Sequence, residues 1–114
     1  MNLTIRERLE AHNCVSTAYL LCDLIPRTIR VIREGETSEL GIKNMLCDII
    51  RHAGRSEFES FEAGLNHLSV VSCATAGTMA QNAIVNGDRF RTAERDLGGL
   101  LEKLNTNADT WLRS

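Results

Sequence analysis

Apolar side chains recur every three or four residues along most of this chain, and this spacing restricts the fold more than any other feature of the sequence. The clearest run comprises Ile42, Met45, Leu46, Ile49, Ile50 and Ala53. Such spacing places one apolar stripe along an α-helix. No segment alternates apolar and polar residues at every second position, which is the pattern of a half-buried strand. The sequence therefore predicts an all-α protein.

Capping signals divide the first third of the chain into two helices. Thr4 and Glu7 form a capping box, in which each side chain accepts from the backbone amide of the other residue, so a helix is expected to begin at Ile5. Pro26 lacks an amide hydrogen and its ring crowds the preceding turn, so we expect the chain to break there. The proline then lies in the first turn of a short second helix, which Gly35 ends in the left-handed conformation.

Three further helices are expected after this point. Residues 36–39 supply a turn and an N-cap for the third helix, which Gly54 is expected to end. Residues 56–59 form a second capping box, which opens a long fourth helix over 57–85. Asp88 caps the last helix.

The predicted architecture is a single helical domain over residues 1–114, with four to five helices in an antiparallel bundle and a long fourth helix. A chain of 114 residues is near the commonest domain size and has no room for a second independent core. Apolar residues make up 43% and charged residues 25%, which is ordinary globular usage. We therefore expect one folded unit, and we expect it to dimerise.

The charge balance and the motifs that are missing argue against several kinds of function. The chain has 13 Lys and Arg against 15 Asp and Glu, so no overall positive field attracts nucleic acid. It contains no nucleophile-elbow motif, no phosphate-binding glycine loop and no closely paired metal ligands such as C-x-x-C. We therefore expect no enzyme activity, no cofactor and no metal site.

The cysteines and the N-terminus bear on the compartment of the protein. Cys14, Cys22, Cys47 and Cys73 are widely spaced within helical segments, so reduced and buried thiols are expected. The residues after Met1 lack the basic and apolar regions of a signal peptide. These features predict a cytoplasmic protein.

Residues 63–87 form the longest stretch without a charged residue. The stretch is long enough to cross a bilayer, but burying its polar side chains in lipid would be too costly, so we expect no membrane span. These polar residues include Asn66, His67, Gln81, Asn82 and Asn86. Many small residues in its second half allow close helix packing, either against the last helix or in a self-complementary dimer seam.

Several aliphatic and aromatic residues of the last two predicted helices are candidate anchors for a protein partner. These candidates are Val70, Val71, Ile84, Val85, Trp111 and Leu112. Gly98 and Gly99 lie inside the last helix, where they imply a close backbone approach or a local bend. Arg27, Arg30 and Arg33 form a small basic stripe, of which Arg30 and Arg33 are candidate polar contacts at the rim of an interface.

Part of the chain resembles a known group of small helical proteins. The residues that carry the resemblance lie within 61–112 and are Gly64-Leu65, His67-Leu68, Cys73-Ala74, Ala76, Gly87-Asp88, Arg91 and Leu100-Leu101-Glu102. With its size and helical organisation, the chain is similar to the QslA-like antiactivators of pseudomonads, which bind the LuxR-type quorum-sensing receptor LasR. The resemblance implies a homodimer that binds the ligand-binding domain of this receptor and thereby blocks receptor dimerisation and DNA binding.

Protein–protein interaction is therefore the function that we expect first, with the chain competing for the helical dimer interface of a transcription factor. Two alternatives stay open. One is a nucleic-acid-binding helical dimer that uses Arg27, Arg30 and Arg33, for which affinity would fall steeply with added salt. The other is a structural protein that assembles only with copies of itself.

Overall fold

The computed structural model describes the backbone of residues 4–35, 37–56, 64–86 and 90–113, and the side chains of the same residues except 64–68 and 107–113. Its elements in chain order are α1 Ile5–Ala11, α2 Val15–Tyr19, the π-helical turn η1 Leu20–Leu24, α3 Ile25–Glu34, α4 Glu39–Ser56, α5 Gly64–Asn86 and α6 Phe90–Arg113. These described residues contain no strand, so the predicted all-α class is confirmed.

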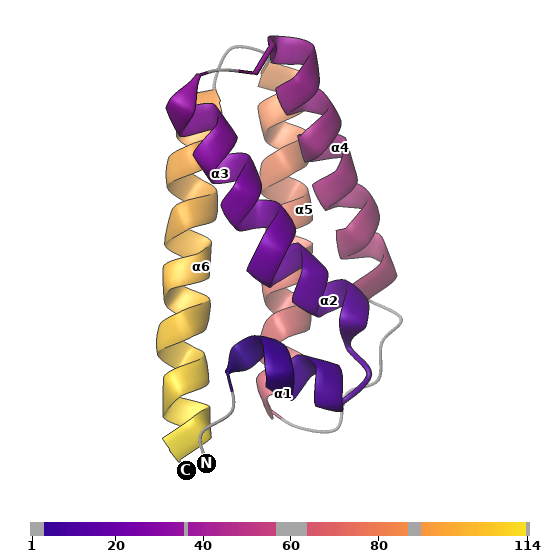
Figure 1. The fold of residues 1–114 in the computed structure, drawn as a ribbon, viewed down its shortest axis with the longest axis vertical. Coiled ribbons are helices and arrows are strands. Elements are labelled where there is room, and N and C mark those ends of the chain that lie inside the picture. Colours follow the sequence, from indigo (N-terminus) through magenta and orange to yellow (C-terminus); the bar gives the residue numbers. More distant parts are fainter. Residues whose placement is uncertain (1–3, 36, 57–63, 87–89, 114) are drawn as a thin grey trace.

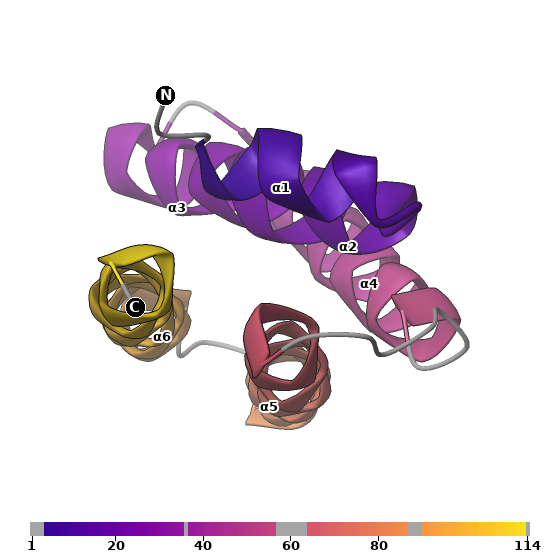
Figure 2. The same cartoon turned by 90° about the horizontal axis from the view of Figure 1, so that it is seen from below.

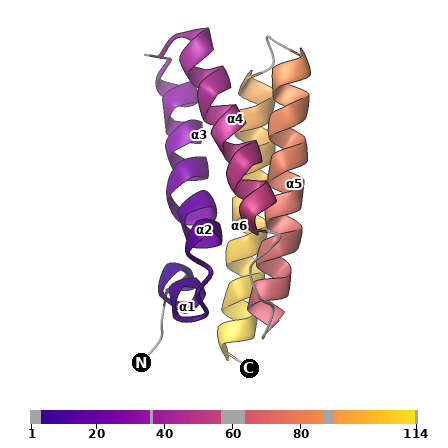
Figure 3. The same cartoon turned by 90° about the vertical axis from the view of Figure 1, so that its right-hand side faces the viewer.

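The long helices form an antiparallel bundle (Figure 1). α2, η1 and α3 make one continuous rod, and this rod, α4, α5 and α6 run alternately up and down. Seen from below, α1 to α4 form one layer, and α5 and α6 form a second layer (Figure 2). The side view shows the same two layers (Figure 3). α4 packs on α5, α3 packs on α6, and α5 packs beside α6, so one face of the α5–α6 layer is turned away from the other described helices.

Large side chains from the rod, α4 and α6 share the core with small side chains from α5. The fully buried large residues include Leu20, Leu24, Ile25, Leu46, Ile49 and Leu97. The buried residues of α5 in this cluster are Cys73, Ala76, Ala80 and Ala83. Small side chains let α5 lie close to α4 and α6. Packing against the last helix was one of the two roles expected for these small residues.

Local signals set several helix ends as predicted. The hydroxyl of Thr4 accepts from the amide of Glu7 at 3.1 Å, and the carboxylate of Glu7 accepts from the amide of Thr4 at 3.3 Å. This is the predicted capping box at the start of α1. Gly35 ends α3 with a φ of 67°, in the left-handed region. The hydroxyl of Ser38 accepts from the amide of Gly41 at 3.2 Å and caps the start of α4.

Pro26 lies in the first turn of α3, as predicted, but the predicted break in the chain at this residue is wrong. The chain leaves the helix earlier, between His12 and Cys14, and then continues helically through the proline. The amide of Ile25 donates to the carbonyl of Leu20, five residues earlier, in the π-helical turn that precedes Pro26. This wider turn makes room for a residue that has no amide hydrogen and carries a bulky ring, so the rod continues.

The end of α4 also differs from the prediction. α4 runs through Gly54, which we expected to end it, and continues to Ser56. Ser56 is buried and its hydroxyl donates to the carbonyl of His52 at 2.8 Å, which holds this last turn in place. The rest of the predicted second capping box and the start of the predicted fourth helix fall on residues 57–63, which lie outside the described residues, as does the predicted cap Asp88.

The prediction that all four cysteines are buried is only partly correct. Cys14 and Cys73 are buried, whereas Cys22 is half-buried and Cys47 is exposed. Cys47 follows the buried Leu46 in α4, and one residue along a helix turns the side chain by about 100°. Cys47 therefore points away from the core although its neighbour points into it.

Candidate functional site

The outer face of α5 is the candidate functional site, because it lies on the side of the bundle that the other described helices leave uncovered (Figure 2). A row of exposed side chains at spacings of three and four residues runs along it. We call this row the α5 seam, and its members are Val71, Ala74, Thr78, Gln81 and Val85. Val71 is 53% and Val85 is 72% exposed, so both ends of the seam present aliphatic surface to solvent.

The α5 seam carries no charge. α5 contains no Asp, Glu, Lys or Arg from its first to its last residue. Exposed helix faces in monomeric proteins are normally rich in charged side chains. An exposed and uncharged helix face of this length is therefore better suited to contact with another helix than to contact with water.

A shallow groove borders the α5 seam on the side of α4. Its lining residues are Ile50, Ala53, Gly54, Ala74, Gly77, Thr78, Gln81 and Asn82, and its volume is ≈ 470 Å³. The two helices come close here, because a Cβ added at Gly77 would lie 3.1 Å from the Cβ of Ala53. Glycine and alanine at this position keep the groove open to a side chain from outside the chain.

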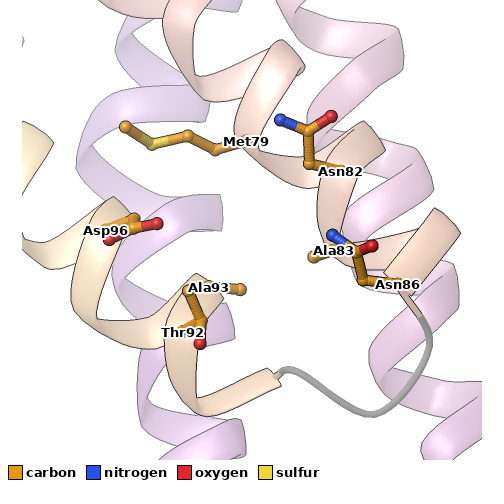
Figure 4. Close-up of a pocket in the computed structure, with 7 residues that line it drawn as sticks. All are labelled: Met79, Asn82, Ala83, Asn86, Thr92, Ala93 and Asp96. Carbon is orange, nitrogen blue, oxygen red and sulfur yellow. The ribbon is translucent and has the colours of Figure 1, made fainter.

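A smaller and more polar pocket borders the α5 seam on the side of α6 (Figure 4). It has a volume of ≈ 120 Å³ and is lined by Met79, Asn82, Ala83, Asn86, Thr92, Ala93 and Asp96. Asn82 and Asn86 come from α5, while Thr92 and Asp96 come from α6. This edge of the α5 seam therefore offers amide and hydroxyl groups for hydrogen bonds, whereas the α4 edge offers mainly small and apolar surface.

Asp96 is the one charged residue that lines the described grooves beside the α5 seam, and it is paired within the chain. Asp96 accepts from Nε of Arg95 at 3.3 Å, and on α4 Asp48 lies 3.2 Å from Arg51. A partner that approaches the α5 seam therefore meets little unbalanced charge. Shape and apolar contact, rather than long-range attraction, would dominate its binding.

The structure separates the four aliphatic candidates of α5 into two pairs. Val71 and Val85 are exposed, as expected for anchors of a partner. Val70 and Ile84 are half-buried, and Ile84 packs against the core. The description of all four as exposed surface is therefore corrected. Val70 and Ile84 lie seven residues on either side of Gly77, which faces Ala53 of α4, so the helical repeat turns both toward α4.

The other candidate residues are not brought to this face by the structure. The side chains of Trp111 and Leu112 lie outside the described residues. In the basic stripe of α3, Arg33 donates to Glu94 of α6 at 2.8 Å, while Arg30 is exposed. Arg27 donates to the hydroxyl of Tyr19 at 2.8 Å. Two of the three arginines therefore already have partners within the chain.

Of the two alternatives expected at Gly98 and Gly99, a close backbone approach or a local bend, the close approach is not found among the described residues. A Cβ added at either residue would meet no atom within 4 Å. Both glycines lie in the interior of α6, where each costs on the order of 1 kcal/mol relative to alanine. Nothing in the described part of the chain accounts for that cost.

Sequence reasoning found the ends of the α5 seam but missed its middle and the groove beside it. Ala74, Thr78 and Gln81 were not among the candidates, and neither was Gly54. Val71, Thr78 and Val85 recur at intervals of seven residues, which is the repeat of a helix-pairing face. That repeat was available in the sequence, whereas the groove depends on how α4 packs against α5.

His52 is the titratable group of α4 that lies against α2. Its Nδ1 is 3.4 Å from the hydroxyl oxygen of Ser16, and the centre of its ring is 4.9 Å from that of Tyr19. Burial lowers the pKa of His52 below the ordinary value of 6.5. Arg55 acts in the same direction, and Asp48 opposes it.

We expect the free energy of unfolding to decrease as the pH falls from about 7.5 to about 5.5. In this range the unfolded imidazole, with a pKa near 6.5, takes up more protons than the folded one, whose pKa is lower. Protonation therefore favours the unfolded chain, and stability rises again as the pH is raised. Urea unfolding at several pH values measures the slope, and His52→Gln should flatten it. An identical slope in the variant would contradict the assignment to His52.

Two searches of the described residues for other kinds of site give negative results. No three side chains of His, Cys, Asp or Glu among them lie close enough to hold a metal ion together. No helix that they form combines the length and the apolar character needed to cross a membrane.

Comparisons with protein-family models, with curated proteins and with solved structures give no match to this chain. The functional argument therefore depends on the geometry of its own residues.

Proposed function

We propose that this chain is a protein-interaction module that binds a helix of a partner protein on the outer face of α5. The observation that carries the proposal is the α5 seam, an exposed and uncharged row with a valine at each end. The groove on the α4 side provides space for side chains of a helix laid along the seam. Binding of an amphipathic helix in such a groove is a common mode of recognition.

The partner that we propose is a LuxR-type transcription factor, on the basis of the resemblance to the QslA-like LasR antiactivators. Such a factor acts as a dimer. If the α5 seam binds the ligand-binding domain of the monomer, mass action removes monomer from the active dimer and DNA binding is lost. This mechanism needs apolar surface that imitates a dimer interface, and it needs no catalytic group.

Self-association is a second candidate role for the same face, and the spacing of the valines favours it. Val71 and Val85 lie seven residues on either side of Thr78. Two copies of α5 in antiparallel orientation, with a two-fold axis at Thr78, would place Val71 of one copy opposite Val85 of the other. No charge on α5 would oppose this contact. The module would then be a homodimer.

The nucleic-acid alternative has less support. Arg27 and Arg33 already contact Tyr19 and Glu94, so only Arg30 of the basic stripe is exposed without a described contact. All three arginines are exposed, but the carboxylate of Glu94 offsets the charge of Arg33, so the stripe offers two unbalanced cations and only a modest salt dependence is expected.

The double substitution Val71→Asp/Val85→Asp tests the proposed function. We expect it to weaken binding to the purified ligand-binding domain of LasR by at least about 100-fold, because two apolar anchors are lost and two charges must be desolvated. Titration calorimetry measures the affinity, and thermal unfolding shows whether the fold is retained. Val15→Asp is the matched control, because Val15 is 63% exposed but lies on α2.

Each outcome of this experiment decides between the roles. If the wild-type chain does not bind the LasR domain, the receptor proposal is wrong. If wild type and double variant bind equally, the α5 seam is not the binding face. A third outcome supports self-association. In that case the wild-type chain does not bind the receptor, and sedimentation equilibrium shows that it is a dimer and that the double variant is a monomer.

A further inference from the structure

α1 packs as a small unit of its own at one end of the bundle. It lies crosswise to the long helices (Figure 1) and packs mainly against α2. Leu9 is fully buried in a cluster with Cys14 and Ala18, against which Ile5 also packs. This cluster is separate from the main core. Among the described residues, the buried contacts of α1 therefore belong to this small cluster and not to the main core.

The link between α1 and α2 has the properties of a hinge. Asn13 has a φ of 62°, the only positive value among the described non-glycine residues. Asparagine tolerates this left-handed conformation better than most residues. Beyond α1, the amides of His12 and Cys14 donate to the carbonyl of Leu9 at 3.2 and 2.8 Å. Rotation at Asn13 would break the bond from the amide of Cys14 to Leu9 without disturbing the hydrogen bonds inside α2.

An ion pair ties α1 to the rod. The guanidinium of Arg6 contacts the carboxylate of Asp23 in η1, and it also lies 3.4 Å from Glu10 in its own helix. The Arg6 and Asp23 side chains are 46% and 34% exposed, so solvent and salt reach this contact. Ion pairs of this kind contribute little free energy and weaken with ionic strength.

One group in α1 opposes the closed arrangement. The Nε of Arg8 is buried and has no hydrogen-bond partner among the described residues. Burying a polar nitrogen without a partner costs free energy, and displacement of α1 would return this nitrogen to water. Closure is therefore a balance between the burial of Leu9 and the ion pair of Arg6 on one side, and the desolvation of Arg8 on the other.

We propose that α1 is a strap that opens as a unit about Asn13 while the four long helices remain folded. Opening uncovers the apolar side of α2 at Cys14 and Ala18, and it frees the thiol of Cys22 from its neighbours Arg6 and Glu10. Burial raises the pKa of Cys22, while Arg6 lowers it and Glu10 raises it. The surface that opening uncovers is separate from the α5 seam, and the strap operates whether or not that seam binds a partner.

Alkylation with iodoacetamide tests the strap, because three of the four cysteines report on different parts of the molecule. Cys47 is exposed, Cys14 lies under α1, and Cys73 lies in the main core. Peptide mass spectrometry measures the alkylation rate of each cysteine in the native chain at a series of low urea concentrations. We expect Cys47 to react first, Cys14 to react at an intermediate rate with little urea dependence, and Cys73 to react only with global unfolding.

Two variants connect the rate at Cys14 to the contacts that close the strap. Asp23→Asn should raise the alkylation rate at Cys14 about three- to fivefold and remove the dependence of this rate on sodium chloride. Leu9→Ala should raise it by at least about 30-fold. The rate at Cys73 should stay unchanged in both. Asp48→Asn is the matched control, because it removes another exposed ion pair, 3.2 Å from Arg51, far from α1 in the sequence.

Two results would overturn the proposal. Equal rates and equal urea dependence at Cys14 and Cys73 would mean that α1 opens only when the whole protein unfolds. A rate at Cys14 as high as that at Cys47 would mean that α1 does not close over α2 at all.

Discussion

Replacing Leu97 with alanine is expected to lower the free energy of unfolding by about 2–5 kcal/mol. Leu97 has no exposed surface and lies in the main core on α6. Its truncation removes apolar contacts and leaves a cavity that close-packed neighbours fill only in part. Small domains have a total stability of about 5–15 kcal/mol, so the variant would lose a large share of it.

Urea unfolding followed by far-ultraviolet circular dichroism measures this loss. The control is Leu40→Ala, because Leu40 is 68% exposed on α4. The control is expected to change the stability by no more than about 0.5 kcal/mol. Equal losses in the two variants would mean that α6 is not docked in the core as described.

Replacing Gly77 with leucine is expected to destabilise the protein by about 1–3 kcal/mol. A Cβ at this position already lies only 3.1 Å from the Cβ of Ala53, and the rest of a leucine side chain would need space that α4 occupies. The two helices would have to move apart. Because Gly77 lines the α4–α5 groove, the same substitution should also weaken binding of a partner helix to the α5 seam.

Gly54→Ala is the matched control, since Gly54 lies across the same groove in the last described turn of α4. Its added Cβ would meet no atom within 4 Å. We expect this variant to be more stable by about 0.5–1 kcal/mol, because alanine restricts the unfolded chain and favours a helix. Opposite signs at the two glycines would verify the close contact between α4 and α5. A stabilising Gly77→Leu would show that this contact is absent.

The sequence predicted those features of the fold that depend on neighbouring residues. The capping box of Thr4 and the left-handed Gly35 are each complete within one turn of helix, so no distant residue can change them. The apolar stripe of α4 also predicted its buried side, where Ile42, Leu46 and Ile49 face the core. Local hydrogen bonds and helical period suffice for such predictions.

The features that sequence reasoning predicted wrongly depend on competition between local preference and packing. Pro26 favours a break, but a π-helical turn accepts it and lets Leu24 and Ile25 remain in the core. Gly54 favours a helix end, but α4 continues two residues further to the buried Ser56. In both cases tertiary contacts outweigh a local penalty of a few kcal/mol or less.

The candidate site shows the same division. The sequence identified α5 as unusual, because its residues are uncharged and many are small. It could not separate Val71 and Val85 from Val70 and Ile84, since aliphatic residues lie on more than one side of this helix. Only the position of α4 decides that the second pair is half-buried and the first pair exposed.

The sequence by itself determined that this chain folds into antiparallel helices and where several of them begin and end, because capping and helical period act within a few residues. The tertiary structure alone decided which face of α5 remains open and where a groove forms beside it. It also decided that α1 packs apart from the main core. These outcomes depend on the approach of helices that are distant in the chain, and that approach is set by the size of side chains such as Gly77 and Ala53 where the helices meet.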